Sequence, residues 1–366
     1  MIHQNLRNLA AILLVLPGLA GLACNRAGAD RDAKHSAAPS ANAAAPGELT
    51  PLAAFTKRWS VAEGLGPGFN EAACSDCHDR EGLGGSGDPA KPARVISSAS
   101  LHLVGVWPRQ AIAGRQPAAL PADAVVNLRR GPPLFGLGLL ERISDQRLNE
   151  LCDPSDRDGD GVTGHVNINT AYDNRPGRFG LQAHTSNIRD FIGNALAGEI
   201  GISNPVNRDP RLNRDDDGVD DPETTAHMVD LLTAYVRSLP APQPLEAING
   251  AEAQAGRKLF GDIGCATCHR PDPDPVAPGA YTDLCVHKLG AQLAGGIVDF
   301  SAQADEWRTA PLWGLGRRQA FLHDGRTTSL AEAIRLHGGE AEASAKRFGG
   351  LAEAEREQLL AFLKAL

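Results

Sequence analysis

The chain has 366 residues, with 36 Lys and Arg against 44 Asp and Glu, which gives a net charge of −8 at pH 7. Because it has no basic surplus to cover phosphates, we expect no nucleic-acid partner. Hydrophobic residues make up 42% of the chain and charged residues 22%, which excludes a largely disordered protein. At roughly 150 residues per domain, the length favours two domains.

The N-terminus has the pattern of an export signal. A basic residue precedes an apolar run over residues 9–23, which is shorter than the roughly 20 residues of a membrane-spanning helix. Two processing sites compete, because the residues before Cys24 resemble a lipoprotein box while Ala27-Gly28-Ala29 suits ordinary secretion. We therefore expect a signal peptide over 1–23, a flexible tether over 24–48, and a periplasmic protein that is either soluble or lipid-anchored through Cys24.

Helical patterns dominate the rest of the chain. Apolar residues recur at helical spacing after Ser186, after Pro222 and over 359–366. Ser329-Leu330-Ala331-Glu332 is a capping-box sequence that opens a further helix. Alternating patterns typical of strands are nearly absent, so the sequence predicts a mainly α fold with long irregular loops.

A proline-rich linker at 239–242 suggests where the two domains divide. We expect an N-terminal domain over 49–244, with insertions, and a C-terminal domain over 245–366. Each of them would carry one C-x-x-C-H segment, at 74–78 and at 265–269. Because this is the spacing of c-type haem attachment, we expect two cytochrome c-like haem domains.

Cys74-Ser75-Asp76-Cys77-His78 and Cys265-Ala266-Thr267-Cys268-His269 both have the C-x-x-C-H spacing of c-type haem attachment. Two thiols one helical turn apart suit the two vinyl groups of one porphyrin, and the adjacent histidine suits the iron. Disulfides or a zinc site are the alternative interpretation. The sequence thus predicts two covalently bound haem c groups, with His78 and His269 as iron ligands.

His337 is a candidate for a second axial ligand in the C-terminal domain. It shares the apolar face of the predicted helix with Leu330, Ala333 and Ile334, where an unpaired imidazole is costly to bury. The alternative is a core histidine with an ordinary hydrogen-bond partner. For the N-terminal iron, His102, His165 and His184 remain open as ligands.

The chain resembles the bacterial di-haem oxidoreductases often labelled thiol oxidoreductases, which are related to the di-haem cytochrome c peroxidases. The resemblance covers nearly all of residues 50–366. The segments that carry it are Gly64-Leu65-Gly66-Pro67-Gly68-Phe69-Asn70, Gly131-Pro132-Pro133-Leu134-Phe135-Gly136-Leu137-Gly138-Leu139-Leu140-Glu141, Gly177-Arg178-Phe179-Gly180, Tyr281-Thr282-Asp283-Leu284, Glu306-Trp307-Arg308-Thr309-Ala310-Pro311-Leu312-Trp313-Gly314 and Phe321-Leu322-His323-Asp324-Gly325-Arg326.

The resemblance implies roles for individual residues. His337-Gly338 occupies the position where the peroxidase relatives place the sixth ligand of the C-terminal haem. The relatives place an acid near the reactive haem, and the segment of this chain that leads to Glu199 is similar to theirs. The resemblance therefore makes Glu199 the candidate catalytic proton donor. The peroxidases carry a glutamine where Phe191 falls here, so peroxidase strength is in question.

Two features lie outside the haem motifs. Asp156, Asp158 and Asp160 stand at alternate positions before Gly161, a pattern typical of calcium loops, although a solvated acidic loop explains it equally well. Cys152 and Cys285 belong to no haem motif, and in an oxidising compartment we expect them to form a disulfide.

The leading interpretation is an exported, peroxidase-like di-haem enzyme. The C-terminal haem would collect electrons from a small redox protein or other donor, and the N-terminal haem would use them on hydrogen peroxide or a small-molecule substrate. The main alternative is a non-catalytic di-haem electron carrier. A redox-sensing partner for another exported protein is a third hypothesis.

Overall fold

The computed structural model describes residues 49–366 apart from 171, 210 and 213–214. The predicted signal peptide, Cys24 and the predicted tether lie outside the described residues. Within them, no helix is long and apolar enough to cross a membrane. The described residues form one compact unit.

Helices are the larger regular part of the fold, which is about 33% helical. The α-helices are α1 (Pro51–Thr56), α2 (Cys74–Cys77), α3 (Leu137–Glu141), α4 (Asp145–Leu151), α5 (Ile188–Ala195), α6 (Ala226–Ser238), α7 (Ala251–Asp262), α8 (Leu330–Arg335), α9 (Glu342–Gly350) and α10 (Glu353–Ala365). Single helical turns of other types are η1 (Val61–Glu63), η2 (Leu196–Ile200), η3 (Glu246–Asn249), η4 (Cys265–Thr267), η5 (Leu315–Arg317) and η6 (Gly339–Ala341).

Side-chain caps mark the starts of α5, α6 and α8. Ser329 caps α8 as predicted, because its hydroxyl accepts the backbone N–H of Glu332 at 3.3 Å. The cap of α5 is Asn187 and not Ser186, since the Asn187 side chain accepts the N–H of Asp190 at 2.9 Å. The helical pattern after Pro222 corresponds to α6. This helix starts three residues later than the proline, after Thr225, whose side chain accepts the N–H of Met228.

The strands form three small antiparallel sheets among the described residues. The largest has the order β3 (Leu103–Trp107), β2 (Ala93–Ser98), β5 (Val125–Arg129). The others pair β1 (Gly68–Phe69) with β4 (Gln110–Ala111), and β6 (Val286–Lys288) with β7 (Glu306–Arg308).

The three-stranded sheet was not predicted from the sequence, in which alternating patterns are nearly absent. In its central strand the adjacent residues Val95 and Ile96 are both buried, since that strand is covered on both faces. In the edge strand Val125 and Val126 are both exposed. Neither strand therefore shows the alternation by which a half-buried strand is recognised.

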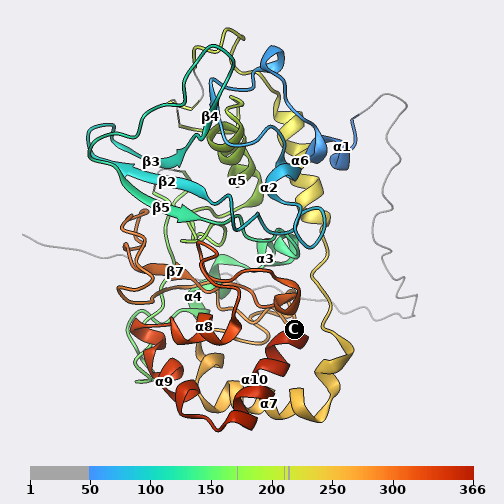
Figure 1. The fold of residues 1–366 in the computed structure, drawn as a ribbon, viewed down its shortest axis with the longest axis vertical. Coiled ribbons are helices and arrows are strands. Elements are labelled where there is room, and N and C mark those ends of the chain that lie inside the picture. Colours follow the sequence, from blue (N-terminus) through green and yellow to red (C-terminus); the bar gives the residue numbers. More distant parts are fainter. Residues whose placement is uncertain (1–48, 171, 210, 213–214) are drawn as a thin grey trace, which may run out of the picture. The chain divides into compact units, whose positions relative to one another are not determined.

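Two hydrophobic cores fill the unit. One lies among α1, α5 and α6 around Phe55 and Leu232, and the other lies among α7, α9 and α10 around Phe260 and Phe362. In Figure 1 these two groups of helices occupy opposite ends of the unit. The first core also includes Trp313 from beyond residue 245. The proposed division at 244/245 stays a prediction, because the two halves share packing.

Helices α7 and α10 pack closely in the second core. A Cβ at Gly256 of α7 would lie 1.9 Å from the carbonyl oxygen of Gln358 in α10, so a side chain there would force the helices apart. Phe260 and Phe362 meet edge to face beside this contact, with ring centroids 5.5 Å apart. This pair of helices forms the base on which the second C-x-x-C-H segment rests.

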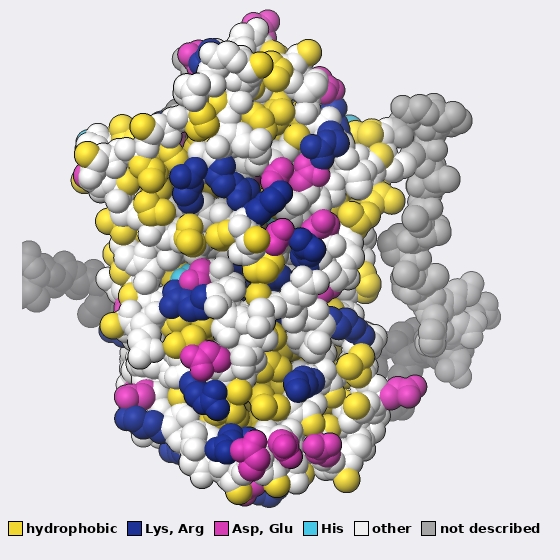
Figure 2. Space-filling view, in the orientation of Figure 1, with side chains coloured by type: hydrophobic (Ala, Val, Ile, Leu, Met, Phe, Trp, Pro, Cys, Tyr) yellow, Lys and Arg dark blue, Asp and Glu magenta, His cyan; other side chains and the backbone are white. Residues whose placement is uncertain are grey.

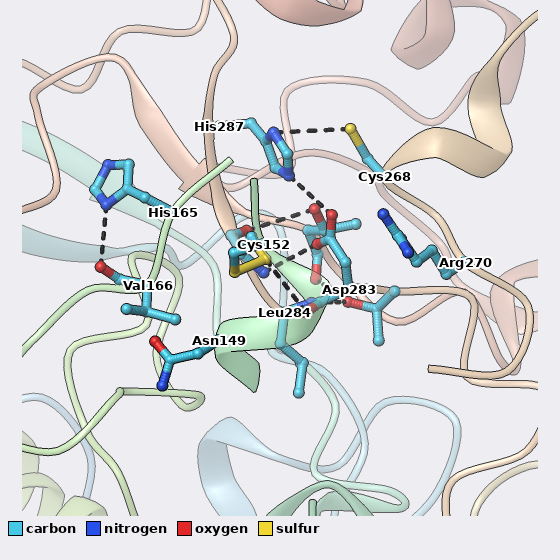
Figure 3. Close-up of a disulfide and its surroundings, with 12 residues drawn as sticks. Asn149, Cys152, His165, Val166, Cys268, Arg270, Asp283, Leu284 and His287 are labelled. Carbon is cyan, nitrogen blue, oxygen red and sulfur yellow. Dashed lines mark hydrogen bonds and ion pairs between the residues drawn. A yellow bond between two sulfur atoms is a disulfide. The ribbon is translucent and has the colours of Figure 1, made fainter. Parts of the chain in front are cut away.

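The disulfide predicted between Cys152 and Cys285 is present (Figure 3). Its two residues are 133 positions apart, one just after α4 and the other just before β6. Both cysteines are buried. The bond therefore ties the end of α4, in the first half of the chain, to the start of the sheet β6–β7 in the second half.

Replacing both Cys152 and Cys285 by alanine is expected to lower the free energy of unfolding by about 2–5 kcal/mol, because the bond restricts a long loop of the unfolded chain. Denaturant unfolding of the oxidised wild type and the double variant measures the difference. Reduction of the wild type under the same conditions is the control and should reproduce the loss. An unchanged midpoint in both cases would show that the bond adds no stability.

The surface is of mixed charge. On the face shown in Figure 2, basic and acidic side chains are interspersed with hydrophobic ones. This distribution matches the near balance of acids and bases in the sequence.

Candidate haem sites

Each C-x-x-C-H segment lines its own cavity. Cys74, Cys77 and His78 line one of about 340 Å³, which we call the N-terminal cavity. Cys265, Cys268 and His269 line one of about 270 Å³, the C-terminal cavity. The three side chains that lie close together in the sequence therefore line one cavity in both cases.

One turn of helix positions the thiols of each segment. The first pair lies at the ends of α2, and the N–H of His78 donates to the carbonyl of Cys74 at 3.1 Å. The N–H of His269 makes the equivalent bond to Cys265 at 3.0 Å. The same local geometry therefore presents two thiols and one imidazole at each cavity.

Both motif histidines are oriented by a backbone carbonyl. Nδ1 of His78 donates to the oxygen of Gly85 at 2.9 Å, and Nδ1 of His269 donates to that of Tyr281 at 3.0 Å. These bonds place the proton on Nδ1 and leave Nε2 with a free lone pair, which suits a metal ligand. Burial lowers the pKa of His78, and it lowers that of His269 to about 4, so both imidazoles are neutral at pH 7.

The four thiols are unsuited to act as free nucleophiles. Burial raises the pKa of Cys74, Cys77 and Cys265 to about 12, and it also raises the pKa of Cys268. At neutral pH these groups are protonated, whereas a reactive cysteine is a thiolate. Paired buried thiols beside a neutral histidine and an apolar cavity are the donor set that fits a c-type haem.

His337 faces the C-terminal cavity together with His269. It lies two residues past the end of α8, and not within the helix as its spacing predicted. Its Nδ1 donates to the carbonyl of Ala333 at 2.7 Å, and burial lowers its pKa. A neutral imidazole with a free Nε2 therefore stands in the same cavity as the motif histidine.

A further histidine stands beside Cys268. His287 lies between two carboxylates, with Nε2 3.0 Å from Asp283 and Nδ1 2.8 Å from Glu340. Burial opposes its charge, yet the bonds with Asp283, Cys268 and Glu340 raise the pKa of His287 well above its ordinary value. Figure 3 shows its ring between Cys268 and Asp283. The sequence analysis assigned this residue no role.

Glu199 lies on the π-helical turn η2 and lines the N-terminal cavity. Its Oε2 accepts a hydrogen bond from the Asn70 amide at 3.0 Å, and its backbone oxygen accepts the N–H of Asn70 at 2.7 Å. Burial raises the pKa of Glu199, against smaller lowering effects of Asn70 and Arg109. A carboxyl that retains its proton more readily than usual is thus held in the cavity of Cys77 and His78.

The three histidines left open for the N-terminal site have different surroundings. His184 lines the N-terminal cavity and stacks on Phe191, with centroids 5.7 Å apart. His165 instead pairs with Glu306 at 2.9 Å, and His102 is exposed. Of these three candidates, His184 is the one that the fold brings to the cavity.

The candidate calcium loop brings its three carboxylates together. Asp156, Asp158 and Asp160 each offer an oxygen within 4.8 Å of the others. Each of the three side chains also accepts a loop N–H group, from Gly161 at 3.1 Å, from Asp160 at 3.3 Å and from Val162 at 2.9 Å. The loop is folded, and its binding of calcium stays a prediction.

The two cavities share one wall. The residues that line both are Arg130, Gly131, Pro132, Pro133, Leu181, Arg308, Ala310 and Arg318. A Cβ at Gly131 would lie 3.2 Å from Cε1 of His78, so glycine lets the wall approach the first motif histidine. The sequence analysis quoted the segments that supply Gly131 and Arg308, but only the fold shows that they meet.

The family model described as "Di-haem oxidoreductase, putative peroxidase" matches residues 109–366. No curated protein matches the chain.

Solved structures with a related arrangement were also found. The diheme peroxidase BthA from Burkholderia thailandensis is 14% identical with a TM-score of 0.41, and the match covers 87% of this chain and 89% of that one. A MauG-like protein associated with microbial copper homeostasis is 19% identical with a TM-score of 0.36, over 71% and 95%. Hydrazine synthase from Kuenenia stuttgartiensis is 22% identical with a TM-score of 0.30, over 38% of this chain and 55% of that one.

The family match covers both the second C-x-x-C-H segment and Glu199, and it leaves the first segment outside its limits. The first segment nevertheless repeats the donor set of the second in its own cavity. The chain therefore belongs to the di-haem oxidoreductase family, which implies two haem groups.

Proposed function

We propose that the protein is an exported di-haem c-type oxidoreductase that reduces peroxide with electrons from a one-electron donor. The observation that carries this proposal is the difference between the two cavities. Each holds two thiols and a motif histidine. The C-terminal cavity adds His337, whose Nδ1 is bonded to a backbone carbonyl, while the N-terminal cavity adds the carboxyl of Glu199 together with His184, whose Nδ1 has no hydrogen-bond partner among the described residues. We assign electron entry to the C-terminal site and the reaction to the N-terminal site.

The thiols of Cys74 and Cys77, and those of Cys265 and Cys268, would hold one haem each through thioether bonds. When bound, haem supplies one-electron storage and an iron to which peroxide can bind. His78 and His269 hold their Nε2 lone pairs ready as iron ligands, because a backbone carbonyl takes each Nδ1 proton. His337 would supply a second imidazole to the iron at the C-terminal site, because its Nδ1 proton is also taken by a backbone carbonyl.

Glu199 would deliver a proton to the leaving oxygen of peroxide. A general acid needs a proton at working pH, and burial favours the protonated carboxyl here. Asn70 fixes the carboxyl by donating to Oε2. A small redox protein is the proposed donor, because such proteins give one electron at a time while peroxide takes two.

The remaining parts of the proposal rest on the sequence. Export to the periplasm follows from the pattern of residues 1–23, and a lipid on Cys24 would anchor the protein to a membrane. A calcium ion bound by Asp156, Asp158 and Asp160 would stabilise their loop, which is tied to Glu340 through the N–H of Thr163 at 3.0 Å.

The test is an optical and EPR study of the isolated protein with both haems attached, followed by addition of hydrogen peroxide. One high-spin signal that reacts with peroxide, beside one low-spin signal, is the expected result. Two unreactive low-spin signals would contradict the proposal.

The second candidate function is a non-catalytic electron carrier. It is favoured by His184, whose imidazole lines the N-terminal cavity and whose pKa is lowered by burial. A neutral histidine there could take the position that peroxide needs. The same spectra separate the two functions, since a carrier has no reactive iron.

Replacement of His337 by alanine should convert the low-spin signal of the C-terminal haem into a high-spin one, because its second axial ligand is lost. EPR and optical spectra of the oxidised protein measure the change. Replacement of His227, an exposed histidine on α6, is the control and should leave both signals intact. A low-spin signal that survives in His337→Ala would show that another residue is the ligand.

A further inference from the structure

The wall between the two cavities contains buried positive charge. Arg130, Arg308 and Arg318 all line both cavities. Arg130 is well provided with partners, because its guanidinium donates to the oxygens of Gly87 and Ala320 and lies 3.9 Å from Glu81. The other two arginines differ from it in this respect.

Among the described residues, the hydrogen bonds of Arg308 and Arg318 go to backbone carbonyls alone. Arg308 donates from Nε to Gly180 at 3.0 Å and from Nη1 to Thr309 at 3.4 Å. Arg318 donates from Nη2 to Pro311 at 2.6 Å and to Trp313 at 3.2 Å. Within the described part of the chain, neither guanidinium forms an ion pair with a carboxylate, and each keeps N–H groups that donate to no protein atom.

The surroundings of these two arginines disfavour an isolated charge. Burial lowers the pKa of Arg308 and of Arg318 to about 10 each, and the charge of Arg318 adds to the effect on Arg308. Both still carry a full charge at neutral pH. Their remaining accessibility is accounted for by the cavities that they line. Asp283 acts on Arg308 and Glu81 on Arg318 without either forming an ion pair with its arginine. A buried cation with no anion in contact is costly, so an anion in the cavities would stabilise both.

The chemistry of the cavities identifies this anion. The C-terminal cavity is otherwise lined largely by apolar side chains, such as Phe260, Leu312 and Leu363. An apolar lining suits a porphyrin ring, whose charged groups are its two propionate carboxylates. Arginine binds carboxylates through two parallel hydrogen bonds, and the free N–H groups of Arg308 and Arg318 are available for this.

We propose that Arg308 and Arg318 bind propionate carboxylates of both haems and so form an electrostatic bridge between the two sites. The inference rests on the proposed attachment of one haem in each cavity. Because each arginine lines both cavities, one positive charge acts on two irons. Loss of either charge therefore lowers the reduction potential of both haems, since a nearby cation favours the reduced form of the iron.

The experiment compares Arg318→Gln, Arg318→Lys and Arg308→Gln with wild type, all as the protein with haem attached. Haem content is measured first. A wild-type protein without two haems would refute the proposed function itself, separately from this inference. Spectroelectrochemical titration then gives both reduction potentials, and resonance Raman spectra report the propionate bending bands.

Arg317→Gln is the matched control. Arg317 is the exposed neighbour of Arg318 and donates to the oxygen of Gln243 at 3.3 Å. We expect Arg318→Gln and Arg308→Gln to lower both potentials and to shift the propionate bands, and Arg317→Gln to change neither. Arg318→Lys should restore most of the potential, because lysine retains the charge.

Three outcomes would overturn the inference. The first is a change in potential in Arg318→Gln that is no larger than that in Arg317→Gln. The second is a fall in potential with unchanged propionate bands, which would place the charge near the irons but away from the propionates. The third is an Arg318→Lys variant that behaves like Arg318→Gln, which would indicate a role in holding the backbone. Arg308→Gln provides the same test if the Arg318 variants do not fold.

Discussion

Replacement of both Cys265 and Cys268 by alanine should leave a protein with one covalently bound haem in place of two. The two thiols lie one helical turn apart at the C-terminal cavity, and they are the attachment points that this cavity offers. Without them the porphyrin can be held only by axial ligands and packing. Mass spectrometry of the denatured protein, together with haem staining after denaturing electrophoresis, counts the groups that remain attached.

The matched control removes a different pair of cysteines. The Cys152→Ala, Cys285→Ala double variant loses the disulfide but keeps all four thiols at the cavities, so it should retain two covalent haems. The corresponding Cys74→Ala, Cys77→Ala variant should also keep one haem, bound at the C-terminal site. If the Cys265 and Cys268 variant still carries two covalent haems, the assignment of this segment is wrong.

The parts of the site that depend on local sequence could be predicted. The C-x-x-C-H spacing fixes two thiols and a histidine on one turn, whatever the rest of the fold does. The disulfide followed from the compartment and from the two leftover cysteines. Ser329 was identified as a helix cap because its partner Glu332 lies three residues away.

The parts that depend on distant contacts could not be predicted. The hydrogen bond between Asn70 and Glu199 joins residues 129 positions apart, and no local sequence pattern indicates it. The shared wall draws Arg130 from one half of the chain and Arg308 and Arg318 from the other. The central strand β2 was missed for a related reason, since burial on both faces removes its alternation.

The candidate ligands illustrate the same limit. His102, His165 and His184 were equivalent in the sequence, and the fold distinguishes them by what surrounds each ring. His165 pairs with Glu306, and His102 is exposed to solvent. Of the three, His184 is the one that lines the N-terminal cavity. His337 was selected on helical spacing, and it reaches its cavity from just beyond the helix end.

Replacement of Glu199 by glutamine should lower the rate of peroxide turnover by about 10²–10⁴-fold, because general acid catalysis typically contributes that much. Glutamine keeps the size of the side chain and a hydrogen-bonding partner for Asn70, but it has no proton to donate. Steady-state turnover with a reduced one-electron donor measures the loss. The haem spectra should be unchanged, which separates a lost proton donor from a lost haem.

The pH dependence of turnover tests whether Glu199 acts in its protonated form. Burial raises the pKa of Glu199, so the carboxyl is protonated below this raised value and ionised above it. Wild-type turnover should therefore fall as the pH rises through the pKa of Glu199, and this fall should be absent from Glu199→Gln.

Glu71 is the matched control, since its side chain lines the same cavity. Its carboxylate lies 3.6 Å from Lys91 and 3.7 Å from Arg109, so it is held by two cations, whereas the Glu199 carboxyl is held by the Asn70 amide. Glu71→Gln should therefore retain most of the turnover and the wild-type fall at high pH. If Glu71→Gln loses both while Glu199→Gln keeps them, the proton donor is Glu71.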